Sequence, residues 1–240
     1  MTGRILTGAL IAGLAAGFLA AILNLWTLTP LILQAEGFEG GHSHAEATAH
    51  SHDDGTTHTH RAEAASAPGQ TAVLSRAMGT VATTLVAYAG FGLLLGAGMA
   101  LAVRSGHRID ARTGLIWGLA GFAAIHLAPA VGLPPELPGL DSAALASRQM
   151  WWAFCVAATA TGLACLAFGR LAGVIVLGVA LILLPHAIGA PQPDTHGGTV
   201  PPGLAAAFAT RSLGVAALSW ALLGTVAGLL TERQPVRAPA

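Results

Sequence analysis

The histidines of one segment have the types and spacing of a metal-binding sequence. Between Gly41 and His60 they form three His-x-His pairs that repeat every eight residues, with acidic residues between them. In an extended chain, residues two apart point to the same side, so each pair can present two imidazoles to one ion. Neutral imidazole with nearby carboxylate suits zinc, nickel, cobalt or copper better than magnesium or calcium. The predicted ligands are His42, His44, His50, His52, His58 and His60, with Glu46, Asp53 and Asp54 beside them.

The composition around these pairs predicts a loop without regular structure. Alanine, glycine, threonine and serine fill the positions between the histidines, and such a polar, biased segment has too few apolar residues to form a core. We therefore expect residues 36–76 to be a disordered, extracytoplasmic loop within a single integral-membrane domain that spans residues 1–240. Such a loop would collect metal ions rather than hold one rigidly.

A second pair of histidines lies next to proline in apolar sequence. His126 precedes Pro129, Pro185 precedes His186, and a glycine, a further proline and an acid-bearing loop follow in both cases. Internal repetition with proline-broken segments at matching positions is typical of a transporter site, and an ionisable residue at membrane depth is a functional candidate. The candidate ligands are His126 and His186 together with Glu136, Asp194 and His196, and Asn24 is a weaker candidate ligand or interhelical hydrogen-bonding residue.

The elements that must position these residues follow from where charge is absent. Only 9% of the 240 residues are charged and 54% are hydrophobic, whereas about a quarter of the residues of a soluble domain are charged. Six charge-free gaps are each about the 20 residues that a helix needs to cross the membrane. The sequence therefore predicts an all-α, polytopic membrane bundle with helices near Ile5 to Leu28, Ala77 to Val103, Thr113 to Val131, Met150 to Phe168, Leu171 to Ile188 and Phe208 to Leu230.

Five spans are the alternative count. Only Gly169 and Arg170 separate the fourth and fifth apolar segments. The first segment resembles a signal peptide, but its apolar run reaches Leu33 and exceeds the 7 to 15 residues of a signal core. We therefore expect it to remain as an uncleaved helix.

The arginines predict the orientation. Short loops rich in arginine stay in the cytoplasm, and a cytoplasmic N-terminus places seven arginines inside and four outside. The inner set is Arg4, Arg104, Arg108, Arg112, Arg170, Arg233 and Arg237; the outer set is Arg61, Arg76, Arg148 and Arg211. The long connections that carry histidine, acid and proline then face outwards.

Three further patterns predict local structure. Small residues recur four apart in several helices, as in Gly13 and Gly17 or Gly114 and Gly118, which is typical of close helix packing in lipid. The tryptophans, including Trp220, fall mostly near predicted helix ends and are interpreted as interfacial anchors. His107 lies in the arginine-rich inner connection and is expected to be solvated.

Several function classes are excluded by what the sequence lacks. The arginines are spread along the chain, so no basic face for nucleic acid is expected. No phosphate-binding loop, nucleophile elbow or zinc-protease motif is present. The two cysteines, Cys155 and Cys165, form neither a metal clip nor a disulfide framework. We expect no enzyme activity and no organic cofactor.

The chain resembles the CbtA family of predicted cobalt transporter subunits over almost its whole length. The resemblance rests on the GLAGF segment, the segment from His126 to Pro129, the stretch GLPPELPG, the entry Arg148-Gln-Met-Trp-Trp and the stretch LPHAIGAP. It implies a bacterial inner-membrane protein with about five spans that takes up cobalt for cobalamin synthesis. It also implies a small histidine-bearing membrane partner, called CbtB. His126, Pro129, Pro185 and His186 match the family motifs.

The leading hypothesis is that the outer loop captures Co²⁺ and passes it to a site built around His126 and His186. A nickel or zinc transporter subunit is an alternative with the same ligand chemistry. A b-type haem protein is another, since axial histidines on two helices can hold haem iron. A third alternative is a metal sensor that does not transport, or a subunit whose partner forms the transport path.

Overall fold

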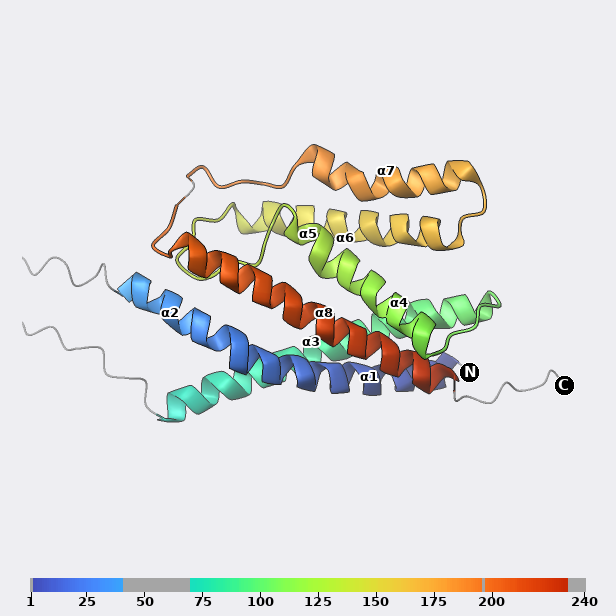
Figure 1. Cartoon of the computed structure of the whole chain (residues 1–240), viewed down its shortest axis with the longest axis horizontal. Coiled ribbons are helices and arrows are strands. Elements are labelled where there is room, and N and C mark those ends of the chain that lie inside the picture. The colour runs from blue at the N-terminus through green and yellow to red at the C-terminus, as the bar shows by residue number, and fades with distance from the viewer. Residues whose placement is uncertain (1, 41–69, 196, 233–240) are drawn as a thin grey trace, which may run out of the picture.

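The chain is α-helical in the part that the computed structural model describes, residues 2–40, 70–195 and 197–232. These residues contain no β-strand beyond one isolated bridge between Leu140 and Gly198. The prediction of an all-α membrane bundle is confirmed (Figure 1). In chain order the elements are α1 (Thr2–Leu23), the π-helix η1 (Asn24–Leu28), α2 (Thr29–Gly40), α3 (Gln70–Arg104), α4 (Ala111–Phe122), the π-helix η2 (Ala123–Leu127), α5 (Ala128–Ala130), α6 (Leu145–Phe168), α7 (Ala172–Ile188) and α8 (Pro202–Glu232).

Five described segments are long and apolar enough to cross a membrane, and α7 is a shorter apolar helix. The five are Gly3–Phe38, Thr71–Arg104, Ala111–Ala130, Leu145–Phe168 and Pro202–Glu232. The 17 residues of α7 extend about 25 Å at 1.5 Å per residue, slightly less than the roughly 30 Å of a hydrocarbon core. The sixth predicted span is thus present as a helix, but it is too short to count with the other five.

The first two long helices extend further than the charge-free gaps predicted. The first continues through η1 and α2 to Gly40, and α3 already begins at Gln70. The predicted loop of residues 36–76 is therefore helical at both ends, because alanine, leucine and glutamine favour helix whether or not lipid surrounds them. Its centre, residues 41–69, lies outside the described residues.

The helices share two ends. Arg4, Arg104 and Arg170 lie at one end, here called the arginine end, where the α3–α4 and α6–α7 connections also lie (Figure 1). The opposite end, here called the loop end, holds the last turn of α2 and the first turns of α3 and α8. The described residues of the predicted outer loops therefore gather at one end of the bundle.

Glycines let the central helices approach closely. A methyl group added at Gly13 would meet the backbone of Tyr88, so α1 lies directly against α3. Gly118 and Gly224 face each other in the same way and hold α4 against α8. Close backbone contact of this kind provides van der Waals attraction between helices in lipid. The prediction that the small-residue faces pack helices together is confirmed for these pairs.

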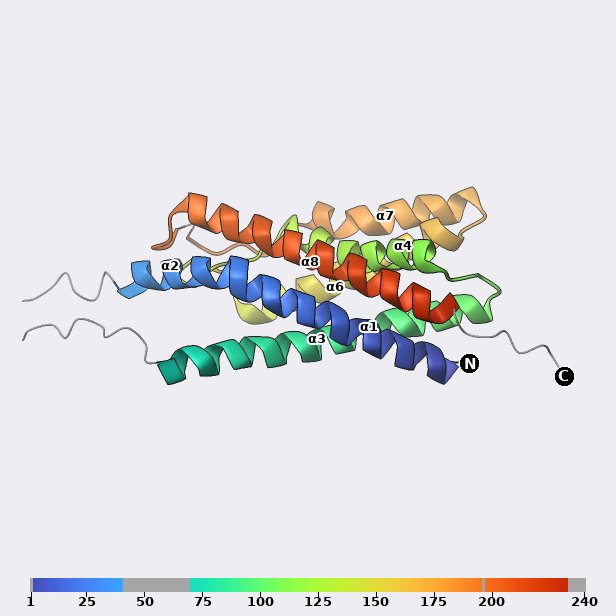
Figure 2. The same ribbon diagram turned by 60° about the horizontal axis from the view of Figure 1, so that its bottom comes forward.

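The remaining two helices form a hairpin at the edge of the bundle. Gly162 of α6 and Gly178 of α7 lie at their contact, and among the described elements α7 packs only against α6. Figures 1 and 2 both show α7 at the margin. The hairpin joins the rest of the bundle mainly where α6 meets η2 and α5. The segment that carries His126 therefore connects the hairpin to the four-helix core.

Candidate functional site

The two helices that flank the histidine-rich segment are tied together at the loop end. Arg76 of α3 donates two hydrogen bonds to the Glu36 carboxylate of α2, at 2.8 and 3.0 Å. Both side chains are exposed, so the pair contributes little to stability. It nevertheless joins the two helices whose ends start and finish the segment with the six predicted loop ligands. Those histidines, His42 to His60, lie outside the described residues, so their metal binding stays a prediction.

A π-helical turn positions His126 inside the bundle. The N–H of Ala128 donates to the carbonyl of Ala123, five residues earlier, which widens the helix over η2. Pro129 follows directly, and a proline supplies no N–H to the preceding turn. Such π-turns often mark functional positions in helices. The sequence predicted that the proline near His126 disturbs the helix. In the structure the helix is widened over η2 and continues through Pro129 without a break.

Three aromatic rings surround His126. The centroid of its ring lies 5.8 Å from that of Phe91 on α3, 6.3 Å from that of Phe122 on α4 and 6.2 Å from that of Trp220 on α8. Its Nε2 is buried and has no hydrogen-bond partner among the described residues. A buried polar atom without a partner costs free energy, so its retention requires an explanation such as a bound water or ion.

A second π-turn was not predicted. It covers η1, between α1 and α2, where the N–H of Thr29 donates to the carbonyl of Asn24 and Pro30 follows. The Asn24 amide also donates to Thr84 of α3, at 3.5 Å. Leu-x-Pro occurs at both turns, at residues 28–30 and 127–129, but also at residues 183–185 inside the ordinary α-helix α7, so the pattern alone does not predict a π-turn.

This parallel changes the internal repeat inferred from the sequence. The π-turns occur in the first and third long apolar segments. The sequence analysis instead paired the segments of His126 and His186, but α7 holds Pro185 within an ordinary α-helix. The feature that repeats is a proline directly after a π-turn. The distance between proline and histidine does not identify it, because Pro185 lies beside His186 without a π-turn.

His186 lies in the last turn of α7 and contacts the start of α6. Its ring centroid is 6.2 Å from that of Trp151, and the Trp151 Nε1–H donates to the carbonyl of Pro185 at 3.3 Å. This carbonyl also accepts the N–H of Gly189, which ends the helix with a positive φ of 89°. His186 is therefore held at the loop end of the α6–α7 hairpin, partly exposed.

The predicted acidic ligands are divided between an ion pair and the surface. The Glu136 carboxylate accepts hydrogen bonds from Arg148, at 2.8 Å, and from Ser142, at 2.6 Å. Asp194 is exposed, and His196 lies outside the described residues. Asp141 accepts a hydrogen bond from Thr195 at 3.0 Å, which links the two loops that carry these candidates.

No group of three or more histidine, cysteine or acidic side chains is placed to hold a metal ion within residues 2–40, 70–195 and 197–232. The predicted set His126, His186, Glu136 and Asp194 is therefore not assembled in this conformation, and its role as a ligand set stays a prediction. Sequence spacing could not show this, because each candidate comes from a different segment.

Two further sequence interpretations concern aromatic and histidine side chains. Trp220, taken for an interfacial anchor, is only 1% exposed and packs at the centre of the core, so that interpretation was wrong. Tryptophan on a helix packed from several sides buries its ring as any large apolar residue does. His107 is exposed, as expected, although its ring also contacts Phe168 at 5.0 Å between centroids.

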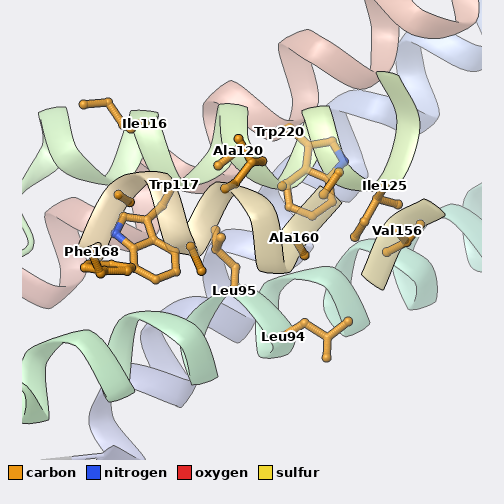
Figure 3. Close-up of a pocket in the computed structure, with 15 residues that line it drawn as sticks. Leu94, Leu95, Ile116, Trp117, Ala120, Ile125, Val156, Ala160, Phe168 and Trp220 are labelled. Atoms are coloured by element: carbon orange, nitrogen blue, oxygen red, sulfur yellow. The ribbon is translucent and has the colours of Figure 1, made fainter. Parts of the chain in front are cut away.

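An apolar cavity of about 370 Å³ lies between α3, α4 and α6. Figure 3 shows Trp117 and Phe168 together at one side of it, with Trp220 and Ile125 towards the other. Its lining is almost entirely hydrocarbon and offers no histidine or carboxylate. Among the described residues, the lining of this cavity therefore provides no metal ligand of the predicted kind.

Comparison with known proteins identifies the family of the chain. Neither a curated protein nor a solved structure matches the chain. Residues 2–232, nearly the whole length, match the sequence model of a family described as probable cobalt transporter subunit (CbtA). The chain belongs to the CbtA family, and it is a multi-pass membrane protein of a cobalt transporter system.

Proposed function

We propose that the chain is the membrane subunit of a Co²⁺ uptake system in a bacterial inner membrane, and that the cobalt it imports supplies cobalamin synthesis. Family membership supports the ion and the subunit role. The arginines at one end of the bundle support a cytoplasmic N-terminus, since arginine-rich loops stay inside. The loop end then faces outwards and meets the metal first.

In this proposal the histidine-rich segment captures metal for the bundle. Its six histidines can bind a first-row divalent ion through neutral imidazole. Near pH 5 they become protonated, since unperturbed histidine has a pKa of about 6.5, and capture weakens. The Glu36–Arg76 pair supports this role because it keeps both ends of the segment at the mouth of the bundle. Deleting residues 41–60 should impair uptake only when cobalt is scarce.

The observation that carries a transport path is the unpartnered Nε2 of His126. It lies inside a bundle of membrane helices and faces no donor or acceptor among the described residues. A neutral imidazole nitrogen in that state can ligate a passing cation. We infer that His126 is the inner ligand of the path and His186 an outer one, with Glu136, Asp194 and His196 contributing at the loop end.

Transport then requires the ligands to assemble. Glu136 must exchange Arg148 for the ion, because its carboxylate now forms a charge-assisted hydrogen bond of 2.8 Å. The α6–α7 hairpin carries His186 and contacts the core over a small area near His126. Movement of this hairpin towards α4 would bring the two histidines closer. A small histidine-bearing membrane subunit of the CbtB kind is the proposed partner.

The test is uptake of radiolabelled cobalt by cells that lack other cobalt importers. The chain is expressed with and without the small partner, and nickel and zinc serve as competitors. Saturable uptake that unlabelled cobalt competes most strongly is expected. Stronger competition by nickel or zinc would assign the alternative ion, and no uptake under either condition would reject the transport role. A visible haem spectrum of the purified protein would favour the redox alternative instead.

A further inference from the structure

Several polar side chains point into the bundle without a partner. Besides His126, the buried atoms that lack a hydrogen bond among the described residues include the hydroxyls of Ser212 and Ser219 and the Nε1–H of Trp220, all on α8. Ser219 is fully buried. Orphaned polar groups inside proteins usually bind ordered water. A fifth such atom, the hydroxyl of Thr159, lies on α6, but three of the five are on α8.

Ser212 and Ser219 share one side of α8, and Ser219 faces a polar group of α3. Ser212 and Ser219 are seven residues apart, close to two full turns, so they lie on nearly the same face. The Tyr88 phenol of α3 interacts with Ser219 without a hydrogen bond of good geometry. One turn earlier on α3, the Thr84 hydroxyl accepts a hydrogen bond from the side-chain amide of Asn24. The segments η1, α3 and α8 thus each contribute polar side chains to the interior of the bundle.

Counting along the helices from the arginine end sorts these residues into two layers. Asn24 is 20 residues from Arg4, Thr84 is 20 from Arg104 and Ser212 is 20 from Glu232, which corresponds to roughly 30 Å in each helix. The second layer lies about 18 to 24 Å from that end by the same count and consists of Tyr88, His126, Ser219 and Trp220. The first layer lies 10 to 16 residues short of the loop-end termini of α2, α3 and α8, so the polar groups lead from the middle of the bundle to the depth of His126.

Between the second layer and the arginine end, the core is apolar. Leu95 and Met99 of α3 and Leu223 and Ala227 of α8 are at most 7% exposed and pack in one cluster with residues of α1. The hydroxyl of Thr225 in this region is already bonded to the carbonyl of Ala221. The described conformation thus has a layer of polar groups at and beyond the depth of His126, with a hydrocarbon seal towards the arginine end and a smaller apolar cluster of Ala35, Leu137 and Val200 towards the loop end.

We propose that the side chains of Asn24, Thr84, Ser212, Tyr88 and Ser219 line a hydrated path that conducts a divalent cation from the loop end to His126. This inference rests on the proposed function, which supplies the ion. Hydroxyl and amide oxygens suit an ion that keeps part of its water shell. Direct bonding then occurs at His126, where imidazole replaces water. The seal of Leu223 and its neighbours separates this path from the arginine end.

Cysteine accessibility tests the path without relying on transport. In a chain with Cys155→Ala and Cys165→Ala, single cysteines are placed on α8 as Ser212→Cys and Ser219→Cys. The controls Leu223→Cys and Ala227→Cys lie on the same helix within the seal. Membrane vesicles are treated with silver ions, small thiol-reactive cations, and the free thiol that remains is measured with a fluorescent maleimide after denaturation.

We expect silver to remove the free thiol of Ser212→Cys and Ser219→Cys, with Co²⁺ slowing the loss, and to leave both controls intact. Size-exclusion profiles identify any variant that has not folded, and the Ala227→Cys control remains if Leu223→Cys fails. The proposed path would be overturned if the thiol of Ser219→Cys survived silver as well as the control thiols do. It would also be overturned if silver removed the thiols at all four positions equally. If silver removed the thiols of Ser212→Cys and Ser219→Cys but the chain transported no cobalt, the proposed function would be rejected and the path would stand.

Discussion

The glycine contact between α4 and α8 should be sensitive to a single methyl group. A Cβ added at Gly224 would lie 2.6 Å from both the Cα and the N of Gly118, and closer still to the carbonyl of Gly114. These atoms are backbone, so no side chain can rotate away. To restore ordinary contact the helices must separate by about 1 Å, and overpacking of this kind costs about 1–3 kcal/mol.

Gly224→Ala should therefore reduce the free energy of unfolding by about 1–3 kcal/mol. That corresponds to a roughly 5- to 140-fold change in the folding equilibrium. Unfolding by sodium dodecyl sulfate in mixed micelles, followed by circular dichroism, measures this change. Gly214→Ala is the matched control, because an added Cβ there meets nothing within 4 Å on the same helix.

The control should be unchanged or slightly more stable, because alanine favours helix over glycine. Parental stability of Gly224→Ala would refute the close packing of α4 on α8. Equal destabilisation of both would show instead that any methyl group on α8 is harmful, and that the glycine contact is not special.

Further predictions concern the connections. Trp151→Phe removes the hydrogen bond to the Pro185 carbonyl and should destabilise the protein by about 0.5–1.5 kcal/mol, measured by the same unfolding assay. Glu136→Gln should lower cobalt uptake more at limiting than at saturating metal, whereas an unchanged half-saturation concentration would exclude this carboxylate from the path. The Thr113 N–H and hydroxyl that bond the Asp110 carboxylate lower its pKa. Asp110 therefore stabilises the fold at pH values above the pKa of Asp110 in the unfolded chain. This stabilisation is lost as the pH falls through the lower pKa of Asp110 in the folded protein. If the thermal midpoint of Asp110→Ala equalled that of the parent at neutral pH, the stabilising role of Asp110 would be contradicted.

The helical architecture could be predicted from charge alone. A charge-free run of about 20 residues has few alternatives in a membrane, and five such runs form long helices. Helix ends were harder to predict, because α2 and α3 continue into polar sequence beyond the apolar core. Apolarity determines where a helix can cross a membrane, but not where it stops.

The candidate site was predictable only in part. His126 and His186 could be selected because each lies beside proline in apolar sequence, yet their surroundings depend on which helices pack together. The aromatic rings around His126 come from α3, α4 and α8. Trp220 was misinterpreted for the same reason, since its burial results from three-dimensional packing. Serines such as Ser219 carry no spacing signal, and only their burial without a partner identifies them.

Cobalt uptake by two histidine variants tests whether the ion passes His126. His126→Gln removes the imidazole proposed as the inner ligand, whereas His107→Gln changes an exposed histidine at the arginine end. Both variants are expressed with the small partner at equal membrane abundance and assayed in saturating radiolabelled cobalt. We expect loss of uptake in His126→Gln and parental uptake in His107→Gln. Parental uptake by His126→Gln would contradict an ion path through the centre of this bundle.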